Sequence, residues 1–403
     1  MRLKIGNGVG NLKRKKMLNI IVNNGSASRK YSLYKEEVLL MSAHYEKIDN
    51  SFLKTEIINE KTREEEISID IFKEAFKDFI KTLIKDGLIN SEEDISKIGI
   101  RIVAPGTFFQ SDYLVDSNFL EKLEDKKVIS PLHIEPVQRE ISEILDNMPK
   151  IPIYAISDSA FHKGKPKFSN IYAYPKDITE KLDLYRFGYH GLSVASIVNK
   201  LKEEGSLPDK LIVCHLGGGS SITAVKNGSS IENSMGYSPI EGIPMATRSG
   251  NVDPNSLFAI MDEKDFTTDE MQRFLYKECG VKGISGLSGD TRVILIEAQK
   301  GNEDAELALD YYSYEIQKII GSYKTILGGL DAIVFTGTIG NRSSDIRKRI
   351  CDGLGALDIS IDQSKNKLMI KSEGDIKDDV SKVDVLIMDT HEMKEMNRAL
   401  SKI

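Results

Sequence analysis

Residues 18–31 read LNIIVNNGSASRKY, and residues 211–223 read LIVCHLGGGSSIT. Each segment begins as an apolar strand, passes through a turn rich in glycine and serine, and leads into a second strand. Such a turn exposes backbone N–H groups and small hydroxyls, which suit it to hold phosphate oxygens. One copy alone is more simply explained as an ordinary hairpin turn. Two copies, each with a basic or imidazole side chain (Lys30 and His215), favour two phosphate-binding hairpins that face one cleft.

The length and composition limit the class of protein. A chain of 403 residues is too long for one hydrophobic core, so two domains are expected. A formal net charge of -6, with 29% charged residues, gives no overall attraction to nucleic acid or to an anionic membrane. No apolar run approaches the roughly 20 residues of a membrane span. The three cysteines lack metal-ligand spacing, which indicates reduced thiols and a cytoplasmic protein.

The start of the chain is basic and lacks the apolar segment of a signal peptide. Residues 1–16 are therefore expected to form a disordered leader.

The first half of the chain alternates short strands with helices. Strands are expected from Leu18 and over Ile98–Val103 and Ile151–Ile156. Apolar residues recur at helical spacing from Asp70, and Gly87 is well placed to end that helix. The strand at 98–103 carries Arg101, and the strand at 151–156 ends at Ser157 and Asp158. Polar residues therefore lie at the ends of these strands.

The second half repeats this order. Strands are expected over Leu211–Leu216 and Ser221–Val225, and a long helix over Asp304–Leu327. The apolar strand Leu330–Phe335 runs into TGTIG at residues 336–340, a third candidate phosphate or nucleotide turn. Strands followed by helices in both halves predict an α/β protein of two domains, with mixed sheets around a central cleft.

Several titratable or cationic residues fall at strand ends or in Gly/Ser-rich turns. A lone histidine before a helix, or a lone arginine in a loop, is more often a cap or a packed side chain than a catalyst. The collection favours a site, because sites on α/β scaffolds gather at strand ends. Its members are Arg101, Asp158, His190, His215, Arg248, Asp290 and Arg292.

Longer motifs carry a resemblance to the acetate kinase family, which lies within the sugar kinase, heat-shock protein and actin superfamily. The resemblance runs from about residue 18 to residue 398, and the motifs follow the family's order. They are NNGSASRKY (23–31), SPLH (130–133), SDSAFH (157–162), FGYHGLS (187–193), CHLGGGSS (214–221), MGYSPIEGIPMATRSGNVDP (235–254), GLSGDTR (286–292), FTGTIG (335–340) and DTHE (389–392). The 20-residue motif at 235–254 is the most specific of them.

The resemblance implies two duplicated ribonuclease H-like (actin-like ATPase) domains. The first would comprise residues 17–160 plus 390–403. The second would comprise residues 161–389, bind nucleotide and form a homodimer. The implied reaction is the reversible, Mg²⁺-dependent transfer of a phosphoryl group from ATP to acetate, giving acetyl phosphate and ADP, with Mn²⁺ as an alternative ion.

The resemblance also implies roles for residues that match the family's motifs. The catalytic residues would be Arg101, Asp158, His190 and Arg248, and Mg²⁺ would be placed by Asn23 and Glu392. The acyl group would be bound by Arg101, Val103, Leu132, His133, Tyr189 and Pro239. Phosphate and nucleotide would be bound by Ser26, Ser28, Lys30, His215, Leu216, Gly217, Gly218, Gly219, Asp290, Thr291, Arg292, Thr338, Ile339, Gly340, Asn341 and Arg342.

Asp158 is not expected to act as a general base. A small carboxylic acid has a pKa of about 4, so it is already ionised at neutral pH and has no proton to remove. Asp158 is instead expected to orient Mg²⁺, its water or an arginine. The alternative is a structural carboxylate that pairs with Arg248.

The chain departs from the family's pattern mainly at the nucleotide end. Gly218 stands in place of an asparagine, and TIGNR at 338–342 in place of GIGEN. Thr338 and Arg342 favour a phosphate-rich donor, so pyrophosphate is an alternative to ATP. Tyr189 stands where a phenylalanine is usual, which leaves acetate and propionate both open. A catalytically silent protein that binds nucleotide or acyl phosphate is the alternative from a different class.

Overall fold

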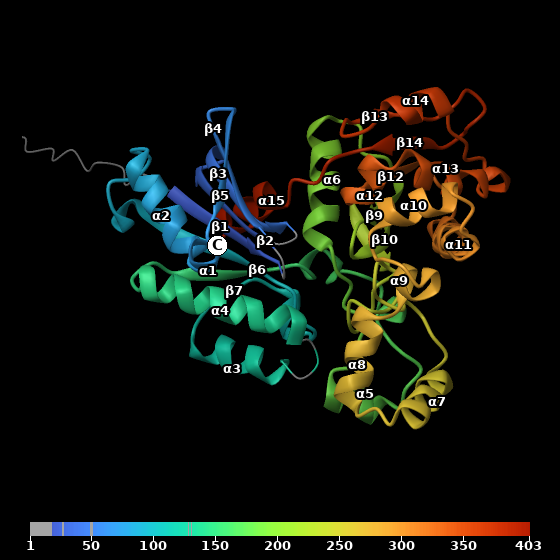
Figure 1. Ribbon diagram of the computed structural model, residues 1–403, viewed down its shortest axis with the longest axis horizontal. Helices are drawn as coiled ribbons and strands as arrows, with labels where there is room; N and C mark the ends of the chain where they lie inside the picture. The colour runs from blue at the N-terminus through green and yellow to red at the C-terminus, as the bar shows by residue number, and fades with distance from the viewer. Residues whose placement is uncertain (1–17, 26–27, 49–50, 128, 130) are drawn as a thin grey trace, which may run out of the picture.

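The computed structural model describes residues 18–25, 28–48, 51–127, 129 and 131–403, without the side chains of residues 131–133. The predicted leader at residues 1–16 lies outside the described residues. Two sheets, one in each half of the chain, lie side by side, with helices around and between them (Figure 1).

The first sheet has eight strands in the order β5-β4-β3-β2-β1-β6-β8-β7. Strands β1 to β5 form an antiparallel meander, while β6 and β8 continue the sheet parallel to β1. The strands are β1 (Leu18–Asn24), β2 (Ser28–Lys35), β3 (Val38–Ile48), β4 (Ser51–Ile58), β5 (Lys61–Ile67), β6 (Ile95–Ile102), β7 (Tyr113–Leu114) and β8 (Ile153–Ser157).

The second sheet has six strands in the order β11-β10-β9-β12-β14-β13. The strands are β9 (Lys210–Leu216), β10 (Ser220–Lys226), β11 (Ser229–Asn233), β12 (Ala332–Thr336), β13 (Gly374–Asp375) and β14 (Asp384–Ile387). Strands β9 to β11 are antiparallel, and β12 and β14 run parallel to β9. This repeats β3-β2-β1-β6-β8 of the first sheet in order and direction, so the two halves share one topology.

In β1 and β9, successive side chains point to opposite faces of the sheet, and each face is covered by helices. In β1, Ile20 packs in the core with α2 and α4, whereas Ile21 packs against Met396 of α15. In β9, Ile212 and its alternate neighbours share a core with α11, whereas Val213 packs with α6. Both sheets are therefore covered on both faces, and α6 and α15 lie side by side between the two sheets (Figure 1).

The helices of the first half, together with the last helix of the chain, are α1 (Ile69–Lys73), α2 (Ala75–Lys85), α3 (Ser117–Asp125), α4 (Pro131–Asn147) and α15 (Glu392–Ser401). Those between Lys176 and Leu368 are α5 (Lys176–Leu182), α6 (Gly191–Glu203), α7 (Pro254–Lys264), α8 (Thr268–Lys277), α9 (Gly280–Ser285), α10 (Thr291–Gln299), α11 (Glu303–Leu327), α12 (Gly337–Arg342), α13 (Ser344–Asp352) and α14 (Gln363–Leu368). Within the described ranges, no helix combines the length and the apolar character needed to cross a membrane.

Two local predictions differ from the structure. The helix expected from Asp70 is divided into α1 and α2, because Glu74 at φ -103° and ψ 37° leaves helical geometry. The third turn, expected at residues 336–340, is mostly helical, since Gly337 begins α12 directly after β12. The predicted apolar face is buried in α2, at Phe76, Phe79 and Leu83, but not in α1, where Ile71 is exposed.

Candidate active site

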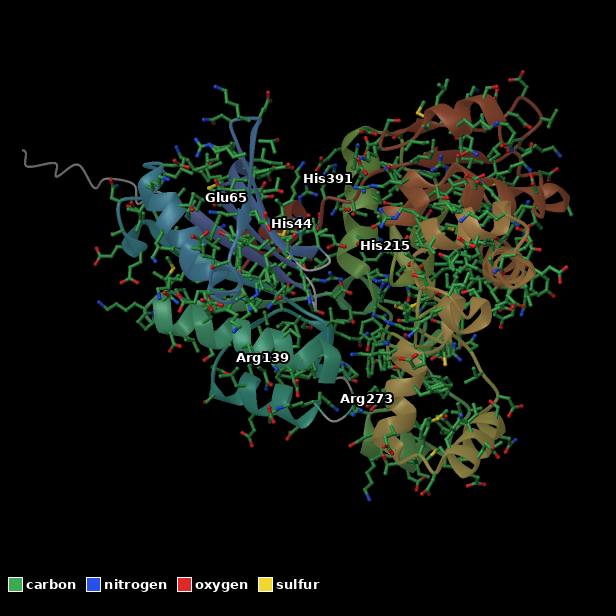
Figure 2. All side chains as sticks on the ribbon, viewed as in Figure 1. His44, Glu65, Arg139, His215, Arg273 and His391 are labelled. Atoms are coloured by element: carbon green, nitrogen blue, oxygen red, sulfur yellow. The ribbon has the colours of Figure 1, made fainter. Side chains whose placement is uncertain are left out.

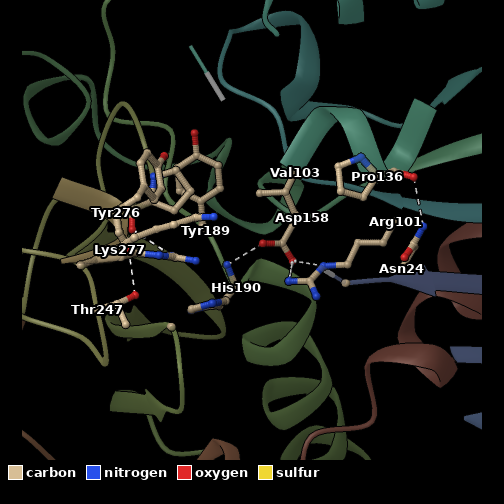
Figure 3. Close-up of a pocket in the computed structure, with 14 residues that line it drawn as sticks. Asn24, Arg101, Val103, Pro136, Asp158, Tyr189, His190, Thr247, Tyr276 and Lys277 are labelled. Atoms are coloured by element: carbon tan, nitrogen blue, oxygen red, sulfur yellow. Dashed lines mark hydrogen bonds and ion pairs between the residues drawn. The ribbon is translucent and has the colours of Figure 1, made fainter. Parts of the chain in front are cut away.

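A cavity of about 390 Å³ lies between the two halves of the chain (Figure 3). Its walls combine residues that follow the strands of the first sheet with loops of the second half. Eight of the lining residues were predicted from the sequence: Arg101, Val103, Asp158, Tyr189, His190, Gly219, Pro239 and Arg248. Six were not: Asn24, Gly25, Pro136, Thr247, Tyr276 and Lys277.

Asp158 follows β8 and is almost fully buried, at 1% exposure. Its Oδ1 accepts from Arg101 Nε at 3.1 Å and lies 3.0 Å from Arg101 Nη2. Its Oδ2 accepts from the backbone N–H of His190 at 2.7 Å. Asp158 thus joins β6, β8 and the start of α6 at one point. The alternative of a pair between Asp158 and Arg248 is wrong, because Arg101 is the arginine that Asp158 contacts.

His190 sits in the left-handed region at φ +58°, immediately before α6. Gly191 lets the backbone approach Asp158, because a Cβ at Gly191 would lie 2.3 Å from the Asp158 carbonyl oxygen. Burial, followed by the neighbouring His215, holds the pKa of His190 well below its usual value, so the ring is neutral at physiological pH. Its Nδ1 lies 3.0 Å from Ser221 Oγ. If that hydroxyl donates, Nε2 carries the hydrogen and becomes a donor.

Arg248, from a loop of the second half, lines the same cavity as Arg101. Its Nη1 donates to the carbonyl oxygen of Pro239 at 3.1 Å, and its guanidinium lies over the ring of Tyr276, 5.6 Å from the centroid. No carboxylate of the described residues forms an ion pair with it. A Cβ at Gly219 would lie 3.4 Å from both Arg248 Nη1 and His190 Nε2, so these two nitrogens converge beside Gly219. The arrangement leaves an uncompensated positive charge at the cavity.

Glu392, at the start of α15, lies on the other side of Arg101. Its Oε2 accepts from Asn23 Nδ2 at 2.9 Å and lies 3.4 Å from Arg101 Nη1, while Oε1 accepts from the Ser193 hydroxyl. Burial alone would raise the pKa of Glu392, but Arg101, His215 and that hydroxyl outweigh it and lower the pKa to about 2. Lys30 also lowers it, which places the charge of Lys30 on this side of the site. The carboxylate is ionised at neutral pH.

One end of the cavity is apolar. Tyr189, Met235 and Met245 form a buried cluster, and Val103 packs against it. The hydroxyl of Tyr189 donates to the carbonyl oxygen of Tyr237 at 2.8 Å, so this added polar group is satisfied away from the cavity.

The predicted phosphate turns of the second half lie together. Gly337, at φ +78°, begins α12 so close to β9 that a Cβ there would lie 2.6 Å from the Leu216 carbonyl oxygen. A Cβ at Gly217 would lie 3.9 Å from Thr338 Oγ1, so the two turns are neighbours. The rings of His190 and His215 stand 4.3 Å apart at 32°, which links these turns to the cavity. Gly218 has open space around it.

The remaining nucleotide residues lie around these turns. Ile339, Gly340, Asn341 and Arg342 are in α12, and Asn341 donates to Asp389 Oδ1 at 2.7 Å. Arg347, fully buried and not predicted, donates to the carbonyl oxygens of Gly340 and Asn341 at 2.8 and 2.9 Å.

Asp290, Thr291 and Arg292 start α10, where Asp290 accepts from Arg292 Nε at 3.0 Å. Gly289, the residue before them, packs against Ala246 and Thr247, which joins this segment to the Arg248 loop.

Three predicted residues are not placed. Ser26 lies outside the described residues, as do the side chains of Leu132 and His133. Ser28 and Lys30 lie in β2, with Lys30 in register with Asn23.

The cavity residues Tyr276 and Lys277, which the sequence did not predict, end α8 within a helical pattern, where no turn or motif distinguishes them.

Among the described residues, no group of three or more His, Cys, Asp or Glu side chains is arranged to hold a metal ion. Figure 2 shows His391 on the segment that runs between the two halves, next to Glu392.

The sequence and the fold were compared with known proteins. Residues 18–398 match the model of the acetokinase family. The acetate kinase of Methanosarcina acetivorans is 38% identical over 397 residues, which cover 95% of this chain and 96% of that protein. A propionate kinase structure from Francisella tularensis superimposes with a TM-score of 0.85 at 31% identity, covering 95% of this chain and 98% of that one. The acetate kinase structure of Porphyromonas gingivalis gives a TM-score of 0.82 at 30% identity, covering 96% and 99%.

These matches run along nearly the whole chain, and they confirm the fold class and the family resemblance that the motifs predicted. The chain belongs to the acetokinase family.

Proposed function

We propose that this protein is an acetate kinase, which transfers a phosphoryl group reversibly from ATP to acetate and forms acetyl phosphate and ADP. The observation that carries the proposal is the cavity between the two halves. Arg101 and Arg248 both line it, one from each half of the chain, and its apolar part is formed by Val103 and Tyr189. A small carboxylate needs this combination of cations for its charge and an apolar surface for its methyl group.

The reaction is an in-line displacement. A carboxylate oxygen of acetate attacks the γ-phosphorus, the bond to the β-phosphate oxygen breaks, and the electron pair leaves with ADP. Negative charge spreads over the equatorial oxygens, and fixed cations and donors stabilise it. We assign these oxygens to Arg248, which has no carboxylate partner among the described residues, and to the neutral His190. Asp158 needs no role as a base and instead orients Arg101 and the His190 backbone.

Asn23 and Glu392 fit a magnesium ion. Mg²⁺ takes oxygen ligands and is usually held by one or two carboxylates together with phosphate oxygens and water. Two observations support this assignment: the Glu392 carboxylate is ionised, and it lies beside the Asn23 amide, whose oxygen accepts from Arg101 Nη1 at 3.4 Å. When bound, the ion would neutralise phosphate charge, and Mn²⁺ would suit the same oxygen ligands. Phosphate oxygens and water would complete its coordination.

The donor is proposed to bind along the second-half turns, Leu216–Gly219 and Thr338–Arg342, with Asp290, Thr291 and Arg292 toward the nucleoside. Ser28 and Lys30 would approach the transferred phosphoryl group from the first half. Pyrophosphate is the competing donor, and two side chains at the second-half turns favour it. Thr338 adds an exposed side chain beside Gly217, and Arg342 adds an exposed cation.

The resemblance also supports proposals on organisation. The first domain would comprise residues 17–160 plus 390–403, consistent with the packing of α15 on β1. The second would comprise residues 161–389 and form a homodimer, and the protein would be cytoplasmic. Light scattering on the purified chain tests the dimer.

The test of function is acetyl phosphate formation, trapped as the hydroxamate. Acetate and propionate are each incubated with Mg²⁺ and either ATP or pyrophosphate. We expect product with ATP and acetate, and a modest preference over propionate, because one methylene is worth about 0.8 kcal/mol. Product with pyrophosphate alone would reassign the donor. Binding of nucleotide or acyl phosphate with no product from any pair would favour the silent binding protein.

A further inference from the structure

Glu140 is a fully buried carboxylate that the mechanism above does not use. It lies on α4, behind the hairpin formed by β1 and β2. Its Oε1 accepts from the Tyr31 hydroxyl at 2.6 Å, and its Oε2 accepts from Asn24 Nδ2 at 2.9 Å. Arg29 Nη1 lies 3.6 Å from the same Oε2. One side chain of α4 therefore contacts both strands of the first phosphate hairpin.

The contacts lie on the two sides of the hairpin turn. Asn24 is the last residue of β1 and is in register with Arg29 of β2. Between them, the N–H of Gly25 donates to the Ser28 carbonyl oxygen at 2.7 Å. Tyr31 follows Lys30 directly on β2. Glu140 thus contacts the hairpin at Asn24, before the turn, and at Arg29 and Tyr31, the two residues that flank Lys30.

Asn24 connects this buried group to the cavity. Its Nδ2 donates to two acceptors on α4, Glu140 Oε2 and the Pro136 carbonyl oxygen at 3.1 Å. Both amide hydrogens are then committed, so the orientation of the side chain is set. Asn24, Gly25 and Pro136 all line the cavity, as Figure 3 shows for Asn24 and Pro136.

A buried carboxylate is a costly way to join a helix to a hairpin. Replacing a buried ionic group with an apolar side chain of similar size is often neutral or stabilising. Two acidic residues, Glu140 and Glu143, lie here around the single cation Arg29, so the charges do not balance. Packing alone does not explain an acidic residue at this position.

We propose that Glu140 is a positioning residue for phosphoryl transfer, which holds the β1–β2 hairpin against α4 through Asn24 and Tyr31. Ser28 and Lys30 are thereby kept in the geometry that the transferred group requires. The inference rests on the proposed function. A displacement of about 1 Å in such a group can reduce turnover roughly 100-fold.

The test compares three variants of the full chain with the wild type. Glu140→Met removes the acceptors at similar size. Glu140→Gln keeps one carbonyl oxygen for Asn24, while its NH₂ can donate to the Tyr31 oxygen. Glu143→Gln is the matched control on the same helix, because Glu143 also contacts Arg29 but otherwise accepts from the backbone of Phe76 and Lys77.

We expect Glu140→Met to lower the kcat of the folded protein by about 10- to 100-fold, with KM for acetate close to that of the wild type. Its melting temperature should fall as well, because the buried Tyr31 hydroxyl loses its acceptor. Glu140→Gln should recover kcat to within about 3-fold, as expected when positioning and not charge is required. Glu143→Gln should lower the melting temperature and leave kcat unchanged. Equal kcat losses in Glu140→Met and Glu143→Gln, or a kcat loss that only follows the unfolded fraction, would overturn the proposal.

Two further measurements keep the outcome decisive. If Glu140→Met does not fold, Asn24→Ala breaks the cavity-side contact without changing the core, and it should reproduce the kcat loss.

Amide hydrogen exchange over residues 18–34 gives a readout that is independent of activity. Faster exchange in Glu140→Met, but not in Glu143→Gln, is expected, and unchanged exchange would count against the proposal. A wild type that phosphorylates no carboxylate would remove the proposed function and leave the exchange result to decide the hairpin contact.

Discussion

The two arginines of the cavity differ in what they contact. Arg101 is therefore expected to contribute to the stability of the protein, and Arg248 mainly to the binding of a ligand. Arg101 pairs with Asp158 and lies near Glu392, two carboxylates inside the protein. Arg248 donates to a backbone carbonyl and packs on Tyr276. The first arginine therefore balances buried charge, whereas the charge of the second is available to a ligand.

Arg248→Ala is expected to lower kcat/KM by about 100- to 1000-fold, comparable to the loss of a transition-state donor, while the protein stays folded. Arg101→Ala should lose activity too, but it should also destabilise the protein by about 3–5 kcal/mol, because it leaves Asp158 buried without its partner. Steady-state kinetics and urea unfolding measure the two effects. Activity near the wild-type level in Arg248→Ala would remove this residue from the transition state.

Glu140 gives the stability of the protein a dependence on pH. Burial outweighs the opposing effects of Arg29 and of the hydrogen bond from Tyr31, and it raises the pKa of Glu140 to about 7. A carboxyl with a raised pKa in the folded state stabilises most below its unfolded pKa of about 4.5, and this contribution is lost as the pH rises to about 7. The free energy of unfolding of the wild type should therefore fall relative to Glu140→Gln across this window.

Relative to Glu140→Gln, the free energy of unfolding of the wild type should fall by at most about 3 kcal/mol, since one pKa unit corresponds to about 1.4 kcal/mol. Above about pH 7 the difference between the two proteins should no longer change with pH. Glu143 faces the same arginine and is present in both proteins, so its titration cancels to first order. Urea unfolding at pH 5, 6, 7 and 8 makes the comparison. Parallel pH profiles for the two proteins would contradict it.

At the scale of elements, the start of α6 is fixed by how closely it approaches Asp158. Gly191→Ala would place a Cβ 2.3 Å from the Asp158 carbonyl oxygen, so either His190 or Asp158 must shift. We expect a loss of kcat of about 100-fold, together with a lower melting temperature. Gly164→Ala is the control, because nothing lies within 4 Å of a Cβ at that position. Wild-type kinetics in Gly191→Ala would show that this contact does not set the geometry of the site.

The short helix α12 depends on Arg347, whose guanidinium makes five hydrogen bonds to Gly340, Asn341, Asn366 and Met369. Lysine carries its donors on a single nitrogen, so Arg347→Lys leaves buried carbonyl oxygens unsatisfied. We expect a loss of about 3 kcal/mol in the free energy of unfolding. Arg349, like Arg347, belongs to α13, but it pairs with Glu306 and Asp310 near the surface, so Arg349→Lys should cost less than about 1 kcal/mol. Equal losses would show that burial of Arg347 does not matter.

The sequence predicted most elements because their local patterns are strong. The helix expected over Asp304–Leu327 is α11, from Glu303 to Leu327, and the Asn227-Gly228 turn joins β10 to β11. Glycine motifs and strand ends likewise located Asp158, His190 and Arg248. The contacts of Glu140 with Asn24, and the positions of Tyr276 and Lys277, join segments far apart in the chain. They depend on packing, for which a single sequence carries no periodic signal.

At the scale of the whole molecule, the cavity is shared between two bodies that are joined through α6 and α15. Arg101 and Asp158 come from the first sheet, whereas Arg248 and Gly219 come from the second half. The contacts between α6 and α15 are of two kinds. Leu192 of α6 packs in an apolar cluster with Met396 and Leu400 of α15. Farther along the helices the contacts are polar: Asn199 Nδ2 donates to Glu395 Oε1 at 2.8 Å, and Arg398 pairs with Glu203.

We therefore expect the two bodies to close when donor and acceptor bind together, because water must be excluded from a transferable phosphoryl group. Small-angle scattering should show a smaller radius of gyration with a non-hydrolysable ATP analogue, Mg²⁺ and acetate than with any of them alone. Arg248→Ala is the informative control. It stays folded but lacks the cation that would draw the second wall toward the bound anions, so its compaction should be reduced. An unchanged radius of gyration in the wild type with all ligands present would contradict closure and would require another route to exclude water.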